Sequence, residues 1–259
     1  MARLRAAQFD EHLTLVEHLD ELRTRIIVSV AVLAVATGLC FWQNDLLLEI
    51  ANRPLPGDRI PITFGVTEPF LTTVTLSVYG GLLLALPVVL YQLYAYVLPA
   101  FSPPEKRVVL PFLLMVPFLF IAGVVFAYFV VVPAATSFLL NFNADEFNIQ
   151  VRAREYYSFF ALTLVAVGVL FQIPVGVLAV TRLGIVTPER LARNRRYAVL
   201  VIAVVAMLLP GTDPVTMLIS MLPLLLLFEL SLLLARLFGR PPEPESEVPR
   251  QAPAPDRAS

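Results

Sequence analysis

Long apolar runs alternate with short polar connections along most of this chain. The runs cover approximately residues 26–42, 70–98, 108–132, 156–180, 197–209 and 215–238. The hydrocarbon core of a bilayer is about 30 Å thick, and a helix needs about 20 residues to cross it. The pattern therefore predicts an all-α membrane protein with six transmembrane helices over residues 26–238.

Two details of these runs predict the shape of the bundle. Prolines lie within or near the ends of most runs, at Pro87, Pro111, Pro117, Pro174 and Pro223. Each proline removes a backbone hydrogen bond and tends to kink its helix, so we expect a curved, concave bundle. The fifth run, residues 197–209, would rise only about 20 Å as a helix, which is less than the hydrocarbon thickness.

Basic residues are distributed unequally between the two sets of connections. Of 19 Lys and Arg residues, 15 lie in the N-terminus, the loops at 99–107 and 181–196, and the end from Arg236. The opposite loops hold only Arg53, Arg59, Arg152 and Arg154. Cytoplasmic loops are the ones enriched in Lys and Arg, so this distribution predicts that both termini are cytoplasmic.

The two ends of the chain differ in character. Leu15, Leu19, Leu22 and Ile26 follow helical spacing, which predicts an amphipathic helix along the cytoplasmic membrane surface within residues 1–25. Residues 239–259 are rich in Pro and Glu and contain almost no large apolar side chain, which predicts a disordered cytoplasmic tail.

The stretch EHLDELRTRI, residues 17–26, carries an excess of acid directly before the first run. Glu17, Glu21 and Arg25 recur every four residues, and a solvated ion-pair ladder of this kind contributes little stability. A membrane-proximal cytoplasmic surface ordinarily favours basic residues. The excess of carboxylates therefore indicates a binding site for something basic.

Two polar residues interrupt the apolar runs. Gln172 lies about 24 Å and Glu229 about 21 Å from the outer end of its helix, which permits a shared intramembrane polar site. A buried carboxylate in a membrane usually faces protein or a water-filled cavity. A hydrogen bond between helices would equally explain Gln172, and snorkelling towards the headgroups would explain Glu229.

The sequence argues against several classes of protein. The composition, 58% hydrophobic residues, excludes a soluble globule, and the single lysine, Lys106, does not follow a glycine-rich phosphate loop. Both histidines precede the first run, and no catalytic or metal-ligating motif occurs. We therefore expect no enzymatic activity, no cofactor, no metal and no nucleic-acid partner.

Several fragments, in order, resemble the TatC family, the multi-spanning core subunits of the twin-arginine protein translocase. They are HLDELRTRI, VTEPF, LPVVLYQLYAYVLPAFSPPEKRVVLPF, FAYFVVVP, FQIPVGVL, GIVTPERLARNRRYAVL and LPGTDPVTMLISMLPLLLLFEL, which extend from His18 almost to the end of the sixth run. The resemblance implies a protein of the bacterial cytoplasmic membrane. It would bind twin-arginine signal peptides and export folded proteins using the proton-motive force.

The resemblance also implies which residues do this. Glu21 and Glu105 would contact the two arginines, Arg23 would organise the site, and Glu17 would lie nearby. A guanidinium pairs with a carboxylate through a planar fork that lysine cannot copy, which agrees with this assignment. Single-span subunits like TatA and TatB would contact the region of Met207, Asp213, Thr216 and Met217. Self-association in a larger complex and contact with lipid are also implied.

Two departures from the family and two alternatives remain. A commonly polar position near the loop before the sixth run is Met217 here, so the contacts with single-span partners would be drier. Gln172 occupies a position where the family often has glutamate, so a proton-relay role there is doubtful. An ion-coupled transporter of small solutes could use Glu229 and Asp213, and a passive membrane scaffold would need neither. Reconstitution of the chain alone would distinguish these classes.

Overall fold

The computed structural model describes residues 15–57, 59–98, 103–208 and 214–238, and this part of the chain is almost entirely helical. The elements are α1 (Leu15–Trp42), α2 (Asn44–Asn52), α3 (Glu68–Val97), α4 (Pro103–Phe126), the π-helical turn η2 (Ala127–Val131), α5 (Val132–Asn141), α6 (Ala153–Leu170), α7 (Ile173–Arg182), α8 (Pro188–Arg193), α9 (Arg195–Leu208) and α10 (Pro214–Phe238). The predicted all-α class is confirmed.

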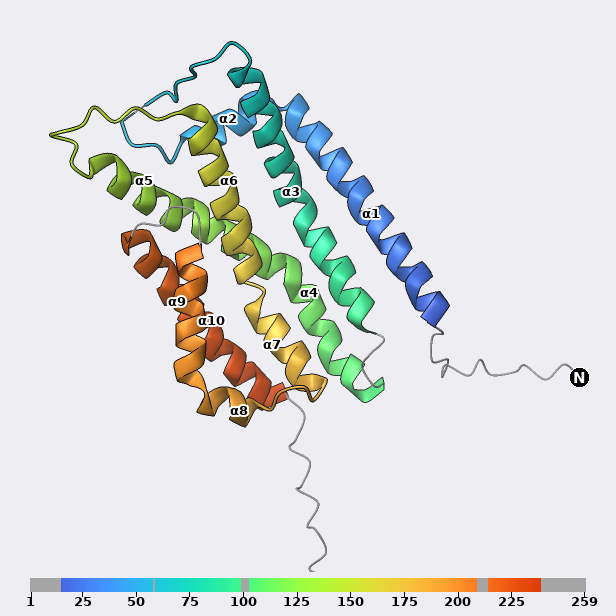
Figure 1. The fold of residues 1–259 in the computed structure, drawn as a ribbon. Coiled ribbons are helices and arrows are strands. Elements are labelled where there is room, and N and C mark those ends of the chain that lie inside the picture. The colour runs from blue at the N-terminus through green and yellow to red at the C-terminus, as the bar shows by residue number, and fades with distance from the viewer. Residues whose placement is uncertain (1–14, 58, 99–102, 209–213, 239–259) are drawn as a thin grey trace, which may run out of the picture.

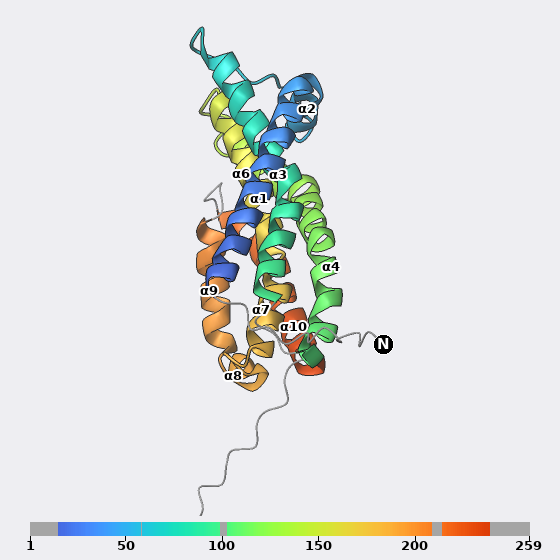
Figure 2. The ribbon, with the colours of Figure 1, turned by 90° about the vertical axis from the view of Figure 1, so that its right-hand side faces the viewer.

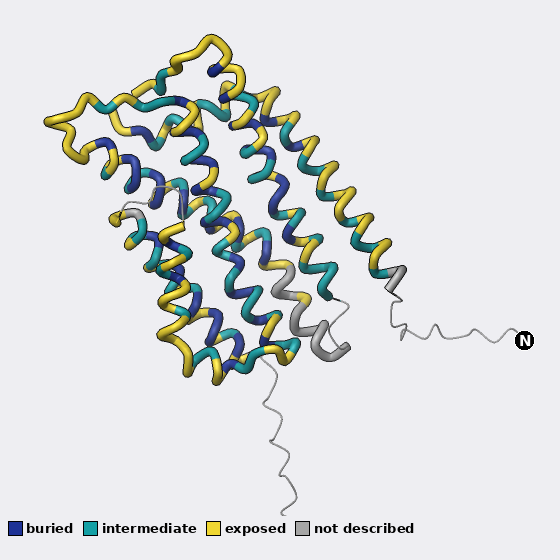
Figure 3. The backbone as a smooth tube through the Cα atoms, viewed as in Figure 1, coloured by how far each residue is buried: buried dark blue, intermediate teal, exposed yellow. Residues whose placement is uncertain are grey.

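The helices form an open, curved wall (Figures 1 and 2). Helix α3 is central and packs on α1, α4 and α6, while α10 packs on α7 and α9. Helices α1 and α9 lie at the two margins, and much of the surface of both is exposed (Figure 3). Because these exposed side chains are mostly apolar, they suit contact with lipid rather than with water.

Among the residues that the structure describes, five helical segments are long and apolar enough to cross a membrane. They are His18–Trp42, Glu68–Val97, Leu114–Asn141, Ala153–Arg182 and Met217–Leu237. Helix α9 lies in the place of the fifth predicted run and has 14 residues, Arg195–Leu208, after which residues 209–213 lie outside the described part of the chain. The short fifth span stays a prediction. In Figure 1, α2 and the first turns of α3 lie at the top, and neither α9 nor the first turns of α10 reach that level.

Prolines have unequal effects on the spans. The third span was predicted too short, because α4 continues through η2 into α5 as far as Asn141. Pro133 lies in the first turn of α5 and cannot donate a backbone hydrogen bond. The widened π-helical turn η2 directly precedes α5, so the helix continues although this hydrogen bond is missing. The kink expected near Pro174 is present as a break between α6 and α7, whereas Pro87 and Pro223 lie inside continuous helices.

Residues 15–25 do not form a helix of their own. They are the first turns of α1, which runs without interruption to Trp42. The segment LDELRTRIIVS contains neither proline nor glycine, so nothing breaks the backbone hydrogen bonds where the polar part meets the apolar part. Over residues 15–25, the predicted surface helix is therefore an extension of the first span, and α1 is about 42 Å long in total. The rest of that prediction, residues 1–14, lies outside the described residues.

The end opposite to the start of α1 is closed by the short helix α2. The hydroxyl of Tyr156 donates to the carbonyl of Ala51 at 2.6 Å, and that of Tyr157 donates to Oδ1 of Asn52 at 2.9 Å. Carbonyls in the last turn of a helix lack intrahelical partners. The tyrosines of α6 thus fix the C-terminal end of α2 against the bundle.

An ion pair joins the first residue of α3 to the loop before α6. The Nε of Arg152 donates to Oε1 of Glu68 at 2.8 Å, and Oε2 of Glu68 accepts from the backbone of Phe64 at 2.9 Å. The Glu68 side chain is only 10% exposed. The hydrogen bond to Glu68 and the charge of that carboxylate raise the pKa of the Arg152 guanidinium above the usual value.

Replacing Arg152 with methionine should destabilise this end of the protein, because it leaves the nearly buried Glu68 carboxylate without its cation. Thermal unfolding in detergent would measure the loss. The double variant Arg152→Met with Glu68→Gln should recover part of it. Breaking the exposed pair between Arg53 and Glu49 is the control and should have a smaller effect. An equal loss in both single variants would contradict the role given to Glu68.

Candidate signal-peptide site

The predicted acidic site lies where α1 begins, α3 ends and α4 begins, all towards one end of the wall (Figure 1). An open groove of about 440 Å³ lies between the first turns of α1 and the last turns of α3. It is lined by Asp20, Glu21, Thr24, Arg25, Val28 and Gln92. The groove thus contains one of the two carboxylates expected to bind a signal peptide.

Glu21 is already engaged by an arginine of its own helix. The Nε of Arg25 donates to Oε1 of Glu21 at 3.0 Å, and its Nη2 donates to the same oxygen. The Nη1 of Arg25 donates to Oε1 of Gln92 on α3 at 2.8 Å. The side chains of Arg25 and Glu21 are 22% and 27% exposed. Arg25 therefore links the carboxylate to the neighbouring helix in a half-buried setting.

The second oxygen of Glu21 faces a histidine. The Nδ1 of His18 lies 3.8 Å from Oε2 of Glu21. The His18 ring stacks on Tyr96 of α3, with ring centroids 4.2 Å apart and planes inclined by 11°. The stack holds the start of α1 against the end of α3, so the position of Glu21 is fixed from two sides.

The other residues of the predicted site are less fully described. Arg23 is exposed on α1, two residues from Glu21. Glu105 and Glu17 lie in the first turns of α4 and α1, and their side chains fall outside the described part of the structure. The structure thus brings Glu21 and Arg25 into one network, and the grouping with Glu105 stays a prediction.

The two intramembrane polar residues do not share partners. Gln172 is 5% exposed, and its Nε2 donates to the carbonyl of Val116 on α4 at 3.3 Å. Glu229 is half exposed and pairs with Arg195, the first residue of α9, at 3.2 Å. Gln172 therefore forms a contact between helices, and Glu229 belongs to an ion pair between α9 and α10. The predicted shared polar site separates into these two contacts.

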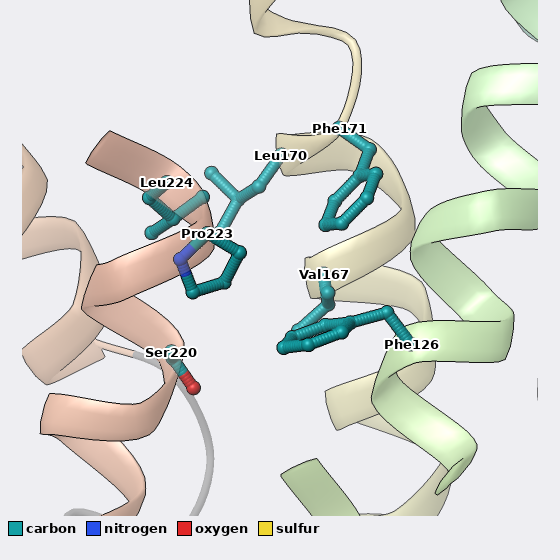
Figure 4. Close-up of a pocket in the computed structure, with 7 residues that line it drawn as sticks. All are labelled: Phe126, Val167, Leu170, Phe171, Ser220, Pro223 and Leu224. Atoms are coloured by element: carbon teal, nitrogen blue, oxygen red, sulfur yellow. The ribbon is translucent and has the colours of Figure 1, made fainter. Parts of the chain in front are cut away.

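The predicted partner-contact region borders a narrow crevice. Met207 is 55% exposed near the end of α9, whereas Met217 packs against the apolar cluster of α9 and α10. Asp213 and the side chain of Thr216 lie outside the described residues. The crevice itself, lined by Phe126, Val167, Leu170, Phe171, Ser220, Pro223 and Leu224, is too narrow to hold a water molecule (Figure 4).

Several contributors were not predicted from the sequence. Gln92 and Tyr96 lie in the fragment YQLYAY at the end of α3, and an amide inside an apolar run is a detectable signal. Ser220 is 2% exposed, and its Oγ has no hydrogen-bond partner among the described residues. Within the same described residues, no group of three or more His, Cys, Asp or Glu side chains could hold a metal ion.

Together, the fold and the groove define a multi-span helical membrane protein with a half-buried carboxylate site at one end of an open wall. The chain belongs to the TatC family, because the family model of the Sec-independent protein translocase protein (TatC) matches residues 17–223.

Individual relatives agree with this membership. The TatC protein of Carboxydothermus hydrogenoformans is 36% identical over 236 residues, covering 90% of this chain and 97% of the relative. That of Aquifex aeolicus is 34% identical over 232 residues, covering 87% and 96%. A crystal structure of the twin arginine translocase receptor TatC, 34% identical, matches with a TM-score of 0.74 over 86% of this chain and all of the other. The similarity therefore extends over nearly the whole described fold.

Proposed function

We propose that this chain is the signal-peptide receptor and core subunit of a twin-arginine translocase. The observation that carries the proposal is the half-buried Glu21 carboxylate in an open groove, already paired with a guanidinium. A site that holds one arginine has the charge and the shape to hold another. The likeness to a solved twin arginine translocase receptor supports the same function.

In this proposal the two arginines of a signal peptide engage Glu21 and Glu105, with Arg23 and Glu17 beside them. The apolar segment that follows the arginines lies along the exposed apolar surface of the wall. Single-span subunits like TatA and TatB bind near Met207, Asp213, Thr216 and Met217. They complete a passage for folded cargo that the proton-motive force drives. The chain itself acts as a receptor and not as an enzyme.

The proposed orientation places the groove in the cytoplasm of a bacterium, with the chain in the cytoplasmic membrane. The unequal distribution of basic residues supports this orientation. So does the position of the groove, since a signal peptide on unexported cargo arrives from the cytoplasmic side. Both termini are then cytoplasmic, because α1 begins and α10 ends towards the same end of the wall (Figure 1).

Site-specific crosslinking tests the receptor assignment. A photoreactive group at Thr24, which lines the groove, should capture a twin-arginine peptide and capture a twin-lysine peptide much less. The same group at Trp42, at the far end of α1, is the control and should not capture the arginine pair. Equal capture at both positions would contradict the assignment.

Reconstitution separates this function from the ion-coupled transporter. The chain alone in vesicles should bind signal peptides and move no small solute, because transport of cargo needs the partner subunits. The pair between Glu229 and Arg195, half exposed at the edge of the wall, gives no specific support for a coupled ion site. Uptake of a solute that depends on a proton gradient would contradict the receptor proposal.

A further inference from the structure

The contact between Arg25 and Glu21 occupies the oxygen that an incoming arginine needs. A carboxylate oxygen has two lone pairs, and both hydrogen bonds from Arg25 fall on Oε1 of Glu21. A two-pronged pairing with a peptide arginine requires both oxygens of the carboxylate. While Arg25 stays in place, only Oε2 of Glu21 is accessible to such a pairing, and His18 already lies 3.8 Å from it.

We propose that Arg25 is a resident competitor, which occupies Glu21 in the absence of cargo and is displaced when a signal-peptide arginine binds. The inference rests on the proposed receptor function and names the event that precedes peptide binding. One guanidinium then replaces another at the same carboxylate. The Glu21 carboxylate is thereby paired with a guanidinium both before and during occupation by the peptide.

Gln92 makes this exchange reversible. Arg25 is only 22% exposed, and leaving a half-buried cation without a partner would be costly. Its Nη1 is held by Gln92 independently of Glu21, through the bond at 2.8 Å. Arg25 therefore keeps one acceptor after it releases the carboxylate, and it remains within reach to return when the peptide leaves.

The exchange sets a threshold for binding and leaves the preference between peptides unchanged. The cost of vacating Glu21 is the same for every ligand that takes the place of Arg25, so it lowers the affinity of twin-arginine and twin-lysine peptides bound there by one common factor. The ratio between them is set by how well each pairs with the vacated carboxylate. Basic segments of unrelated proteins that pair only weakly with Glu21 then have too low an affinity to displace Arg25.

The variant Arg25→Lys tests the proposal while keeping the charge constant. Lysine retains the positive charge but cannot make the two simultaneous contacts with Oε1 of Glu21, so Glu21 is vacated more easily. Binding of fluorescent twin-arginine and twin-lysine peptides to the full chain in detergent should tighten by about three- to tenfold for both. The ratio of the two affinities should stay the same.

A second variant and a control complete the experiment. Arg25→Met removes both the contacts and the charge and should tighten binding at least as much as Arg25→Lys. Arg53→Lys changes an equivalent pair with Glu49 on α2, far from the groove, and should change nothing. Weaker binding in the Arg25 variants would overturn the proposal, since it would make Arg25 a positioning residue for Glu21. Unchanged binding, or an altered ratio, would overturn it as well.

A parallel measurement distinguishes failure of this inference from failure of the proposed function. If Glu21→Ala binds the twin-arginine peptide as well as the unmodified chain does, Glu21 is not the receptor site, and both proposals are overturned. If Glu21→Ala loses binding while the Arg25 variants do not gain it, only the competitor role of Arg25 is overturned.

Discussion

Glu21→Ala should weaken binding of a twin-arginine peptide by about 10- to 100-fold, the range expected when a charge-assisted hydrogen bond is lost. The half-buried position of Glu21 makes its pairing less screened than one at the surface. Glu105→Ala should act in the same direction. Peptide affinity at low salt, measured on protein that remains inserted in the membrane, is the readout.

Two controls accompany this prediction. Glu17→Ala should have a smaller effect, since Glu17 lies one turn further from the groove along α1. Glu49→Ala breaks a pair of the same spacing on α2 and should leave peptide affinity unchanged. Unchanged affinity in both the Glu21 and the Glu105 variants would rule out these carboxylates as the arginine contacts.

The second large effect should come from Gly81→Leu, which forces α1 away from α3. A Cβ added to Gly81 would meet Oγ1 of Thr37 and would come within 2.6 Å of its Cα. Backbone atoms cannot rotate away, so the helices must separate. We expect a loss of about 1–3 kcal/mol in the free energy of unfolding, the usual cost of overpacking. Peptide affinity should fall as well, because Glu21 and Gln92 lie on these two helices.

The matched control for Gly81 lies on the facing helix. A Cβ added to Gly38 of α1 would meet nothing within 4 Å, so Gly38→Leu introduces the same side chain without the clash. Both variants gain the same helix propensity over glycine, and the difference between them isolates the contact. Similar thermal stability of the two variants in detergent would show that close approach of α1 and α3 is not needed.

The topology of this protein is readable from its sequence because the bilayer imposes simple rules. A run of apolar residues long enough to cross the hydrocarbon must form a helix there, since no other local structure satisfies its backbone. The break near Pro174 follows from the missing amide donor. The extension of the third span to Asn141 does not, because η2 lets a helix continue past Pro133.

The candidate site was only half predictable. Glu21 stands out because a cluster of carboxylates at a membrane surface is unusual. The bond between Arg25 and Gln92 depends on how closely α1 approaches α3. The lack of a side chain at Gly81 allows a close approach, since an added Cβ would clash with Thr37 of α1. The separate partners of Gln172 and Glu229 depend likewise on helix rotation, which depth in the membrane does not determine.

Helix α9 also has a consequence for the lipid beside it. Its 14 residues rise about 21 Å, several ångströms less than the hydrocarbon core of about 30 Å. Arginines at its start can reach the headgroups on one side, but its other end stops inside the acyl chains unless the bilayer thins there. Thinning costs only fractions of a kcal/mol per ångström. We therefore expect the bilayer to be thinnest along the margin formed by α9, so that less further deformation would be needed there than beside the longer helices.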